Sequence, residues 1–362
     1  MRFQRNANLD SKTFYIDYII KSQNNFLSDR TQLEFMMSNI ETSVKQAHQI
    51  AQQIRQVVSR VIVGQQDMVD SLLIGVFTRG HILLEGAPGL AKTLVIRTLA
   101  QILQLPFQRV QFTPDLLPSD LIGTEIYSPK TGDFSTRKGP IFTSILLADE
   151  INRAPPKVQS ALLEAMAERQ VTIGTESFPL PNPFLVLATQ NPLEQEGTYP
   201  LPEAQADRFM FKIVVQYPTI EEEKQILLGS SQREQTLSTL SSVISKENVL
   251  QIQNIVSQIH IEDMLYDYIL QIIHATRDAR RFGIPVSRYI QFGASPRASI
   301  AMQAASKARA FLQGRNYVTP DDIKYVAPAI LRHRIVPTYE AEAEMVVTDF
   351  IIDSILQHIR TP

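Results

Sequence analysis

The residues with the clearest capacity for chemistry are Lys92 and Thr93, which close the sequence Gly86-Ala87-Pro88-Gly89-Leu90-Ala91-Lys92-Thr93. Small residues in such a stretch allow successive backbone N–H groups to converge on phosphate oxygens. Lys92 can reach the terminal phosphates of a nucleotide, and the hydroxyl of Thr93 can ligate Mg²⁺. We therefore predict a phosphate-binding loop, with a strand-to-helix turn carrying an incidental lysine as the alternative.

One position departs from the common pattern G-x-x-x-x-G-K-S/T, because Ala91 stands where the second glycine is usual. A methyl group is tolerable there if the residue already has helical backbone angles. The flanks support the prediction, since residues 81–85 read as a buried strand and residues 94–100 as a helix. The residues expected to bind the nucleotide at this loop are Gly86, Ala87, Pro88, Gly89, Leu90, Ala91, Lys92, Thr93 and Leu94.

Two acids, Asp149 and Glu150, end a second apolar run over residues 144–148. Parallel α/β sheets bind their ligands at the carboxyl edge of the strands, which is where these carboxylates are expected. Asp149 is suited to hold Mg²⁺, and Glu150 is suited to orient and deprotonate an attacking water. A strand that simply ends at a polar turn is the alternative, and the preceding phosphate loop disfavours it.

Three further polar residues each allow two interpretations. Asn191 follows a predicted strand over 184–189 and can hydrogen-bond a water or the γ-phosphate, although Asn-Pro also favours a plain turn. Arg208 is either a surface arginine paired with Asp207 or a cationic finger for a neighbour's nucleotide. Arg297 lies in the first turn of a predicted helix, where a cation is unfavourable and an anionic partner is expected, unless it is an ordinary exposed arginine.

Composition excludes several classes of protein. The 362 residues carry a formal net charge of −2 and include no cysteine, so we expect no disulfide framework, thiolate metal site or cysteine nucleophile. A sequence pI of about 6.3 gives no basic footprint for non-specific nucleic-acid binding. Neither a signal peptide nor an apolar run long enough to span a membrane is predicted, so a cytoplasmic protein without membrane insertion is expected.

The elements that must position these residues follow from periodicity. A helix is predicted over about 34–61, and residues 61–65 read as a short apolar strand that could wall a base pocket. Two hairpins are predicted near 124–138 and 170–180, and strand patterns disappear after residue 242. The remaining predicted strands cover residues 107–112 and 211–215, and the later helices cover 246–259, 261–281, 296–313, 320–333 and 338–359.

Taken together, these residues resemble an AAA+ ATPase, and more closely a member of the MoxR family, over about residues 60–335. Both hairpins are similar to the two insertions of the clade that also contains magnesium-chelatase ATPase subunits and MCM helicases. Besides the phosphate loop with its Ala91, the stretches that carry the resemblance are Gln111–Asp120, Arg137–Pro140, Ala148–Ala154, Ala188–Pro192 and Leu201–Phe209.

The resemblance implies roles for single residues. Lys92 and Thr93 would form Walker A, and Asp149 and Glu150 would form Walker B. Asn191 would be sensor 1, Arg208 the arginine finger and Arg297 sensor 2, acting either in its own subunit or across an interface. The residues that would lie beside the adenine are Val63, Gly64 and Gln65.

We expect an α/β AAA+ domain with a parallel sheet over residues 35–228, an all-helical lid domain over 229–362, and an N-terminal extension over 1–34 to which no role is assigned. The predicted function is Mg²⁺-dependent ATP hydrolysis that drives remodelling or maturation of a protein client. The resemblance also implies a ring oligomer, expected to be a hexamer, and a partner with a von Willebrand A domain.

Three other functions are less consistent with the sequence. A nucleic-acid motor of the same clade is disfavoured by the near-neutral charge, with no nucleic-acid partner expected. A nucleotide-gated scaffold with little turnover is disfavoured by Glu150. A phosphotransferase would leave Asn191, Arg208 and the lid without a role.

Overall fold

The structure is a computed structural model that describes residues 40–130, 132–192, 197–229, 240 and 242–362. The N-terminal extension predicted over 1–34 lies outside these residues. A helix over residues 40–58 leads into the α/β part and confirms most of the helix predicted there. Its buried face repeats at helical spacing through Val44, Ala47, Ala51, Ile54 and Val58.

Residues 61–65 do not form the predicted strand. The backbone N–H groups of Val61 and Ile62 both donate to the carbonyl of Val58, at 3.0 and 2.9 Å, and so complete the end of the preceding helix. Those groups are not available to a sheet ladder, and Val61 and Ile62 are buried within a turn instead.

A five-stranded parallel sheet forms the centre of the α/β part, in the order β2-β5-β8-β1-β9. Its strands are β1 (Ile82–Glu85), β2 (Phe107–Gln111), β5 (Ile145–Asp149), β8 (Leu185–Gln190) and β9 (Phe211–Val214). In the inner strands successive apolar residues face opposite sides, as the twofold periodicity of a strand requires. Ile82 and Leu84 pack on the side of α2 (Gln66–Thr78) and α3 (Lys92–Ile102), and Leu83 packs with α5 (Pro156–Glu168).

At the amino end of β1 a buried histidine joins two strands. His81 Nδ1 accepts a hydrogen bond of 2.9 Å from the backbone N–H of Val186 in β8. Burial lowers the pKa of His81 to about 4, so the ring is neutral at physiological pH.

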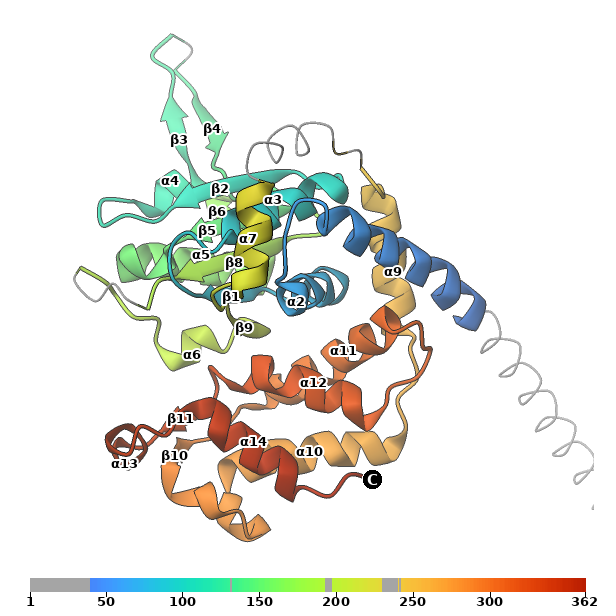
Figure 1. Ribbon diagram of the computed structural model, residues 1–362. Coiled ribbons are helices and arrows are strands. Elements are labelled where there is room, and N and C mark those ends of the chain that lie inside the picture. Colours follow the sequence, from blue (N-terminus) through green and yellow to red (C-terminus); the bar gives the residue numbers. More distant parts are fainter. Residues whose placement is uncertain (1–39, 131, 193–196, 230–239, 241) are drawn as a thin grey trace, which may run out of the picture.

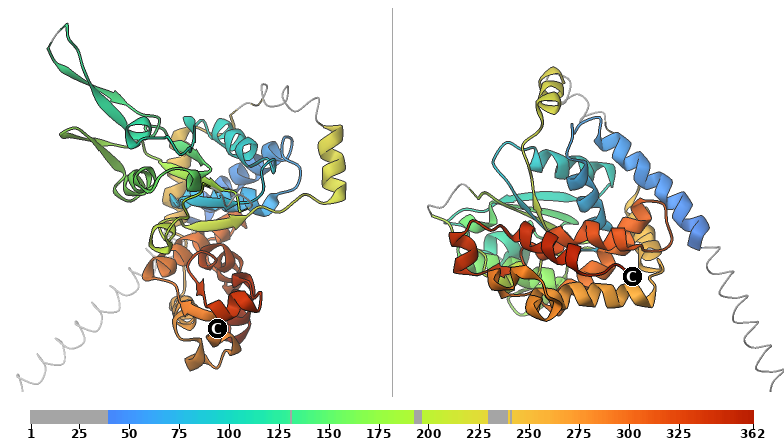
Figure 2. Two further views of the ribbon diagram at one scale, coloured as in Figure 1. Left: turned by 90° about the vertical axis from the view of Figure 1, so that its left-hand side faces the viewer. Right: turned by 60° about the horizontal axis from the view of Figure 1, so that its bottom comes forward.

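Both predicted hairpins are confirmed. They are β3 (Gly123–Tyr127) with β4 (Phe134–Lys138), and β6 (Gln170–Ile173) with β7 (Glu176–Pro179). Figure 2 shows both hairpins projecting from the same side of the α/β part. Tyr127 and Phe134 are 53% and 68% exposed, and their rings contact each other at a tilt, with 5.3 Å between ring centroids. Three short helical segments connect the larger elements: α4 (Pro118–Ile122), η1 (Ile151–Arg153) and α6 (Glu203–Ala206).

The C-terminal part is mainly helical and lies beneath the sheet in the view of Figure 1. Its helices are α9 (Lys246–Ser257), α10 (Asp263–Arg277), η2 (Ala279–Phe282), η3 (Pro285–Tyr289), α11 (Pro296–Leu312), α12 (Pro320–Leu331), α13 (Tyr339–Ala343) and α14 (Thr348–His358). Helix α7 (Ile220–Leu228) precedes them, and none of its residues is buried. The domain boundary predicted at 228/229 stays a prediction.

Two expectations for this part are wrong. The lid is not all-helical, because β10 (Ile290–Phe292) pairs with β11 (Val336–Pro337) in an antiparallel ribbon. The helix predicted over 338–359 is split into α13 and α14, since Met345 adopts φ +54° and Val347 is extended. These backbone angles interrupt helical hydrogen bonding, and the apolar periodicity on either side did not reveal the break.

The sheet and the lid share one apolar core, in which residues of α2 and the helix over 40–58 pack with α9 and α11. Hydrogen bonds to Asp70 of α2 also link this helix to the helix over 40–58 and to α11. Asp70 accepts hydrogen bonds from Arg55 at 2.7 Å and from Arg309 of α11 at 2.8 Å. Within the described residues, no helix combines the length and apolarity needed to cross a bilayer.

Candidate functional site

The loop predicted to bind phosphate, residues 86–93, follows the carboxyl end of β1, and β1 itself lies between β8 and β9 in the sheet. Lys92 is the first residue of α3, and its Nζ donates to the carbonyls of Gly86 and Ala87 at 2.5 and 3.2 Å. Burial lowers the pKa of Lys92, and the carboxylates of Asp149 and Glu150 oppose this shift. The lysine is therefore held over the loop in the electrostatic field of the two acids.

Ala91 does not have the helical backbone angles at which a methyl group would be tolerated without strain. Its backbone is left-handed, with φ +57° and ψ +15°, at the N-cap of α3. This conformation costs a non-glycine residue roughly 1–2 kcal/mol, which explains why glycine is common at this position. Ala91 still caps the helix through its carbonyl, which accepts from Val95 N–H at 3.0 Å.

A cavity of about 370 Å³ brings the predicted chemical residues together. Lys92, Thr93 and Asn191 line it beside the two acids, and Asn191 is buried at the end of β8. We call Lys92, Thr93, Asp149, Glu150 and Asn191 the phosphate-loop face. The full lining is Pro88, Gly89, Leu90, Ala91, Lys92, Thr93, Leu94, Arg109, Asp149, Glu150, Thr189, Gln190 and Asn191.

The carboxylate of Asp149 is fixed from two sides. Its Oδ1 accepts from the Thr189 hydroxyl at 2.6 Å, and its Oδ2 accepts from Arg109 Nε at 2.9 Å. The same Thr189 hydroxyl accepts from the backbone N–H of Glu150 at 2.8 Å. Thus β8 sets the orientation of both acids at the end of β5.

Glu150 takes a left-handed backbone conformation, with φ +57°, immediately after β5. Its Oε2 accepts from Gln111 Nε2 at 2.8 Å and pairs with Arg153 Nε at 3.0 Å. A non-glycine residue held in this conformation at a cavity wall is typical of functional sites. Contacts from β2 and η1 therefore place the carboxylate that was predicted to activate water.

Sequence reasoning missed Arg109, Gln111, Arg153 and Thr189. Arg109 and Gln111 could have been identified from the sequence. They are alternate residues of a predicted strand, and alternate residues of a strand share one face. The structure adds the register, in which Gln111 lies opposite Asp149 on β5. Only this pairing shows that the β2 side chains meet the acids.

The residues present fit a bound magnesium ion. Thr93 and Asp149 line the same cavity. Among the described residues there is no cluster of three or more His, Cys, Asp or Glu side chains that could form a complete metal cage. Magnesium commonly binds through one or two protein oxygens together with waters and substrate phosphates, which is what this donor set offers.

A second cavity, of about 860 Å³, is lined by the three residues predicted to lie beside adenine, Val63, Gly64 and Gln65. Gly64 has φ +67°, and a Cβ there would lie 2.2 Å from an oxygen of Glu222 on α7. The positive φ favours glycine at this position, and the carboxylate of Glu222 on α7 lies directly against it. Thr219 and Glu222 form the N-terminal capping box of α7 at the cavity wall.

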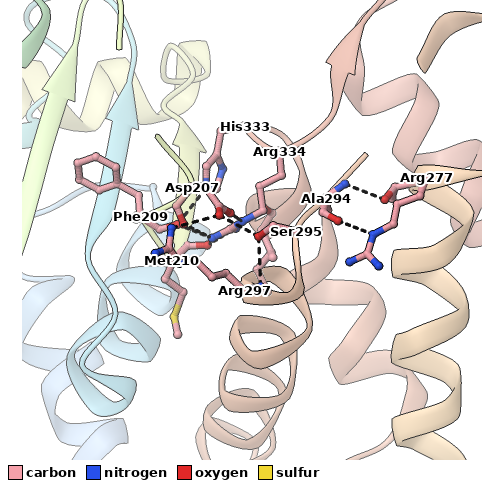
Figure 3. Close-up of polar contacts among 11 residues, drawn as sticks. Asp207, Phe209, Met210, Arg277, Ala294, Ser295, Arg297, His333 and Arg334 are labelled. Atoms are coloured by element: carbon pink, nitrogen blue, oxygen red, sulfur yellow. Dashed lines mark hydrogen bonds and ion pairs between the residues drawn. The ribbon is translucent and has the colours of Figure 1, made fainter. Parts of the chain in front are cut away.

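Arg208 and Arg297 lie apart from the phosphate-loop face. In the described part of the chain, the lining of the 370 Å³ cavity includes neither residue. Arg208 Nη1 donates to the carbonyl of Leu163 on α5 at 2.9 Å, whereas the expected alternative was a pair with Asp207. Arg297 instead pairs with Asp207, at 3.5 Å between Nη1 and Oδ2 (Figure 3). We call Asp207, Arg208 and Arg297 the finger face.

Comparisons with known proteins agree with this geometry. The model of the ATPase family associated with various cellular activities matches residues 81–211, and that of the AAA lid domain matches residues 285–355. The chain is 48% identical over 306 residues to "Chaperone MoxR1" of Mycobacterium tuberculosis, covering 84% of this chain and 80% of that protein. It is 45% identical over 305 residues to "Uncharacterized protein YeaC" of Bacillus subtilis, covering 84% of this chain and 92% of the relative.

A solved structure is similar over nearly the whole fold. The crystal structure of a protein from Cytophaga hutchinsonii is 50% identical, with a TM-score of 0.84, covering 90% of this chain and 99% of that one. The central sheet, the lid and their arrangement therefore recur in an experimentally determined relative.

Proposed function

Because this chain belongs to the MoxR family of AAA+ ATPases, we propose that it hydrolyses ATP with Mg²⁺ in a ring assembly and uses the energy to remodel a protein client. One observation carries the proposal. Lys92, Thr93 and the two acids at the end of β5 converge on one cavity at the carboxyl edge of the sheet, together with Asn191. This arrangement suits phosphoryl transfer to water, in which catalysis is mainly positioning and charge stabilisation.

Each residue of the phosphate-loop face has a separate task in the proposed reaction. Lys92 exchanges its contacts with the loop carbonyls for the β- and γ-phosphates, and Asn191 orients the γ-phosphate or the water. Glu150 accepts the proton of the attacking water. Thr93 and Asp149 would hold Mg²⁺, whose positive charge offsets that of the phosphates.

We place Arg208 and Arg297 at the nucleotide of a neighbouring subunit. Support comes from their position on the finger face, away from the phosphate-loop face of their own chain. An arginine supplied in trans stabilises charge that develops in the transition state and makes turnover depend on assembly. A closed ring, which we take to be a hexamer, places one finger face against each phosphate-loop face.

The client is proposed to be a protein. The exposed pair Tyr127 and Phe134 on the projecting hairpin offers apolar surface of the kind that protein partners cover. The formal net charge of −2 gives no electrostatic footprint for nucleic acid. We further propose a cytoplasmic location and a partner with a von Willebrand A domain, as in the family in general.

The test of the proposed function mixes two inactive variants, Arg208→Ala and Lys92→Ala. Each supplies what the other lacks at a shared interface, so mixed assemblies should regain part of the parental ATPase rate. Specific activity of the parental protein should also rise with its concentration. No recovery in mixtures shown by two affinity tags to contain both chains, or full activity of the monomer, would exclude the trans arrangement.

The client is sought with Glu150→Gln, which should bind ATP without completing turnover. Proteins that co-purify with this variant in the presence of ATP, and not with Lys92→Ala, are candidate clients. Stimulation of ATP turnover by DNA or RNA would instead favour a nucleic-acid motor.

A further inference from the structure

The carboxylate of Asp207, the residue before Arg208, is bound by three side chains of the lid. Its Oδ1 accepts from Arg334 Nε at 2.7 Å, and its Oδ2 accepts from the Ser295 hydroxyl at 2.8 Å (Figure 3). The guanidinium of Arg297 is 3.5 Å from the same oxygen. The side chains of Asp207 and Arg334 are only 14% and 2% exposed, so solvent screens this pair little.

Arg334 also binds the backbone on both sides of Arg208. Its Nη2 donates to the carbonyls of Phe209 and Asp207, at 2.6 and 3.1 Å, and its Nη1 donates to the carbonyl of Met210 at 3.1 Å. The planar guanidinium has five N–H donors in a fixed geometry, so these bonds restrict the flanking peptides in more than one direction.

His333 adds one more contact from the lid. Its Nε2 lies 3.0 Å from the carbonyl of Phe209. Burial is the largest cause that lowers the pKa of His333 well below its usual value, and the adjacent Arg334 lowers it further. The ring is therefore neutral, with Nε2 as the donor to Phe209.

The position of Ser295 is itself fixed by α10. The N–H of Ala294 donates to the Thr276 hydroxyl at 3.0 Å, and its carbonyl accepts from Arg277 Nε at 2.7 Å. Gly293 lies so close to α10 that a Cβ would be 2.3 Å from the carbonyl oxygen of Thr276. Hydrogen bonds from α10 to Ala294, and from the adjacent Ser295 to Asp207, therefore connect α10 to the carboxylate beside Arg208 (Figure 3).

We propose that Asp207 is a positioning residue through which the lid sets the direction of Arg208. This inference rests on the proposed role of Arg208 at a neighbour's nucleotide. A finger raises the rate only where its guanidinium meets the transferred phosphoryl group, and a misplacement of about 1 Å can cost roughly 10²-fold in rate. Within the described residues the guanidinium of Arg208 donates to the carbonyl of Leu163, and the backbone that carries this side chain sets the direction in which it can extend.

The test compares Asp207→Asn with Asp70→Asn. The side chains of both acids are similarly exposed, 14% and 15%, and each accepts from a lid arginine. Asp207 also contacts Ser295 and Arg297, whereas Asp70 also accepts from Arg55, belongs to α2 and is part of neither face. Asn keeps the shape of the side chain and removes its charge. Asp207→Asn should lower kcat of the assembled protein roughly 10- to 100-fold with ATP Kd changed less than about threefold. Asp70→Asn should leave kcat within about threefold of parental.

Mixing separates positioning from a general loss of structure. Asp207→Asn should regain activity when mixed with Lys92→Ala, which supplies an intact finger, but not when mixed with Arg208→Ala. Arg334→Lys is the second variant, should Asp207→Asn fail to fold, because it keeps the positive charge beside Asp207 and cannot bind all three carbonyls. It should show the same pattern of recovery with a smaller loss in kcat.

Unchanged kcat in both variants, or recovery with Arg208→Ala and not with Lys92→Ala, would overturn the proposal. Equal losses of kcat in Asp207→Asn and Asp70→Asn would also overturn it, because the loss would then follow from disrupting any contact between the α/β part and the lid. Failure of the trans arrangement is distinguished by the mixture of Arg208→Ala with Lys92→Ala, which contains the native Asp207 in every chain.

Discussion

The phosphate-loop face and the finger face are positioned by different means. On the first, the acids lie at the end of β5 and are fixed by residues of β2 and β8, so the sheet itself sets their geometry. On the second, the segment around Arg208 follows the four-residue helix α6, and lid side chains bind the carboxylate of Asp207 and the carbonyl of Phe209 on either side of Arg208. One face is therefore positioned by backbone pairing within one domain, and the other by side-chain contacts between two parts of the chain.

This difference predicts which perturbations reach which face. A sheet ladder holds its strand ends against many local changes, because its hydrogen bonds are shared among neighbours. Side-chain contacts to a short segment depend on a few groups, so the loss of one is felt directly. Loss of the lid contacts to Asp207 should thus alter the finger face and leave the phosphate-loop face unchanged.

The largest effect is expected for Arg208→Ala. Turnover in the assembly should fall roughly 10³- to 10⁵-fold, because the cation that stabilises transition-state charge is lost. ATP Kd should change much less, since the contact tightens mainly in the transition state. Steady-state kinetics and calorimetry on the same samples give both values, with Arg208→Lys as the charge-conserving control. A turnover rate near the parental value would show that Arg208 does not act at the nucleotide.

The second largest effect is expected on the other face. Glu150→Gln keeps the size and hydrogen-bonding capacity of the side chain but loses the base, and turnover should fall roughly 10²- to 10⁴-fold. Binding of ATP should persist. Glu164→Gln, which changes an exposed acid on α5, is the matched control and should behave as the parental protein. Hydrolysis at the parental rate by Glu150→Gln would show that another group activates the water.

The third prediction concerns stability below neutral pH. His81 is neutral in the folded state because burial lowers its pKa from 6.5 to about 4. The unfolded chain binds a proton at this histidine near pH 6.5, and the folded chain does not. His81 therefore costs no stability above pH 6.5, and the free energy of unfolding decreases as the pH falls from 6.5 toward 4. The loss attributable to His81 should approach roughly 3 kcal/mol.

Denaturant unfolding at several values between pH 7 and pH 4 measures this loss. His81→Asn is the matched variant, since its amide oxygen can accept from Val186 N–H without titrating. Its stability should depend less steeply on pH than that of the parental protein. Equal slopes would show that His81 does not stay neutral in the folded chain.

The smallest of the predicted effects is on nucleotide affinity. Lys92→Ala removes charge-assisted bonds to the phosphates, and ATP Kd should rise roughly tenfold or more. Lys307→Ala provides a matched control, because burial also lowers the pKa of Lys307 and its Nζ binds the carbonyl of Ser257, outside the cavity. Calorimetry should find a normal ATP Kd for the control. Parental affinity in Lys92→Ala would refute its phosphate contact.

The positions of the phosphate-loop residues at the ends of strands could be predicted from the sequence, because the patterns that mark them are local. Lys92 and Thr93 are consecutive, as are Asp149 and Glu150, and each pair directly follows a strand or loop that apolar periodicity can identify. The strands and both hairpins were predictable for the same reason. Residues 61–65 were wrongly predicted as a strand, because a short apolar run does not show which of its backbone N–H groups already donate to carbonyls of the preceding helix.

The finger face was much less predictable. Asp207 was considered only as a partner for Arg208, whereas its partners Ser295 and Arg334 lie 88 and 127 residues away in sequence. Such contacts depend on how the lid packs, and no local pattern encodes them. Likewise, the left-handed angles of Ala91 and Met345 break the preference of their residue type and become visible only in the folded chain.

The continuous core has a mechanical consequence. Apolar side chains of α2, α9 and α11 interlock with the helix over 40–58, so bending one part of the protomer against the other would open voids in a close-packed interior. Each protomer is therefore stiff along its length. If the proposed ring forms, we expect its protomers to move relative to one another as whole chains, and Tyr127 and Phe134, the last pair of the β3–β4 hairpin, would then swing with the body of the protomer and be displaced further than residues near the sheet.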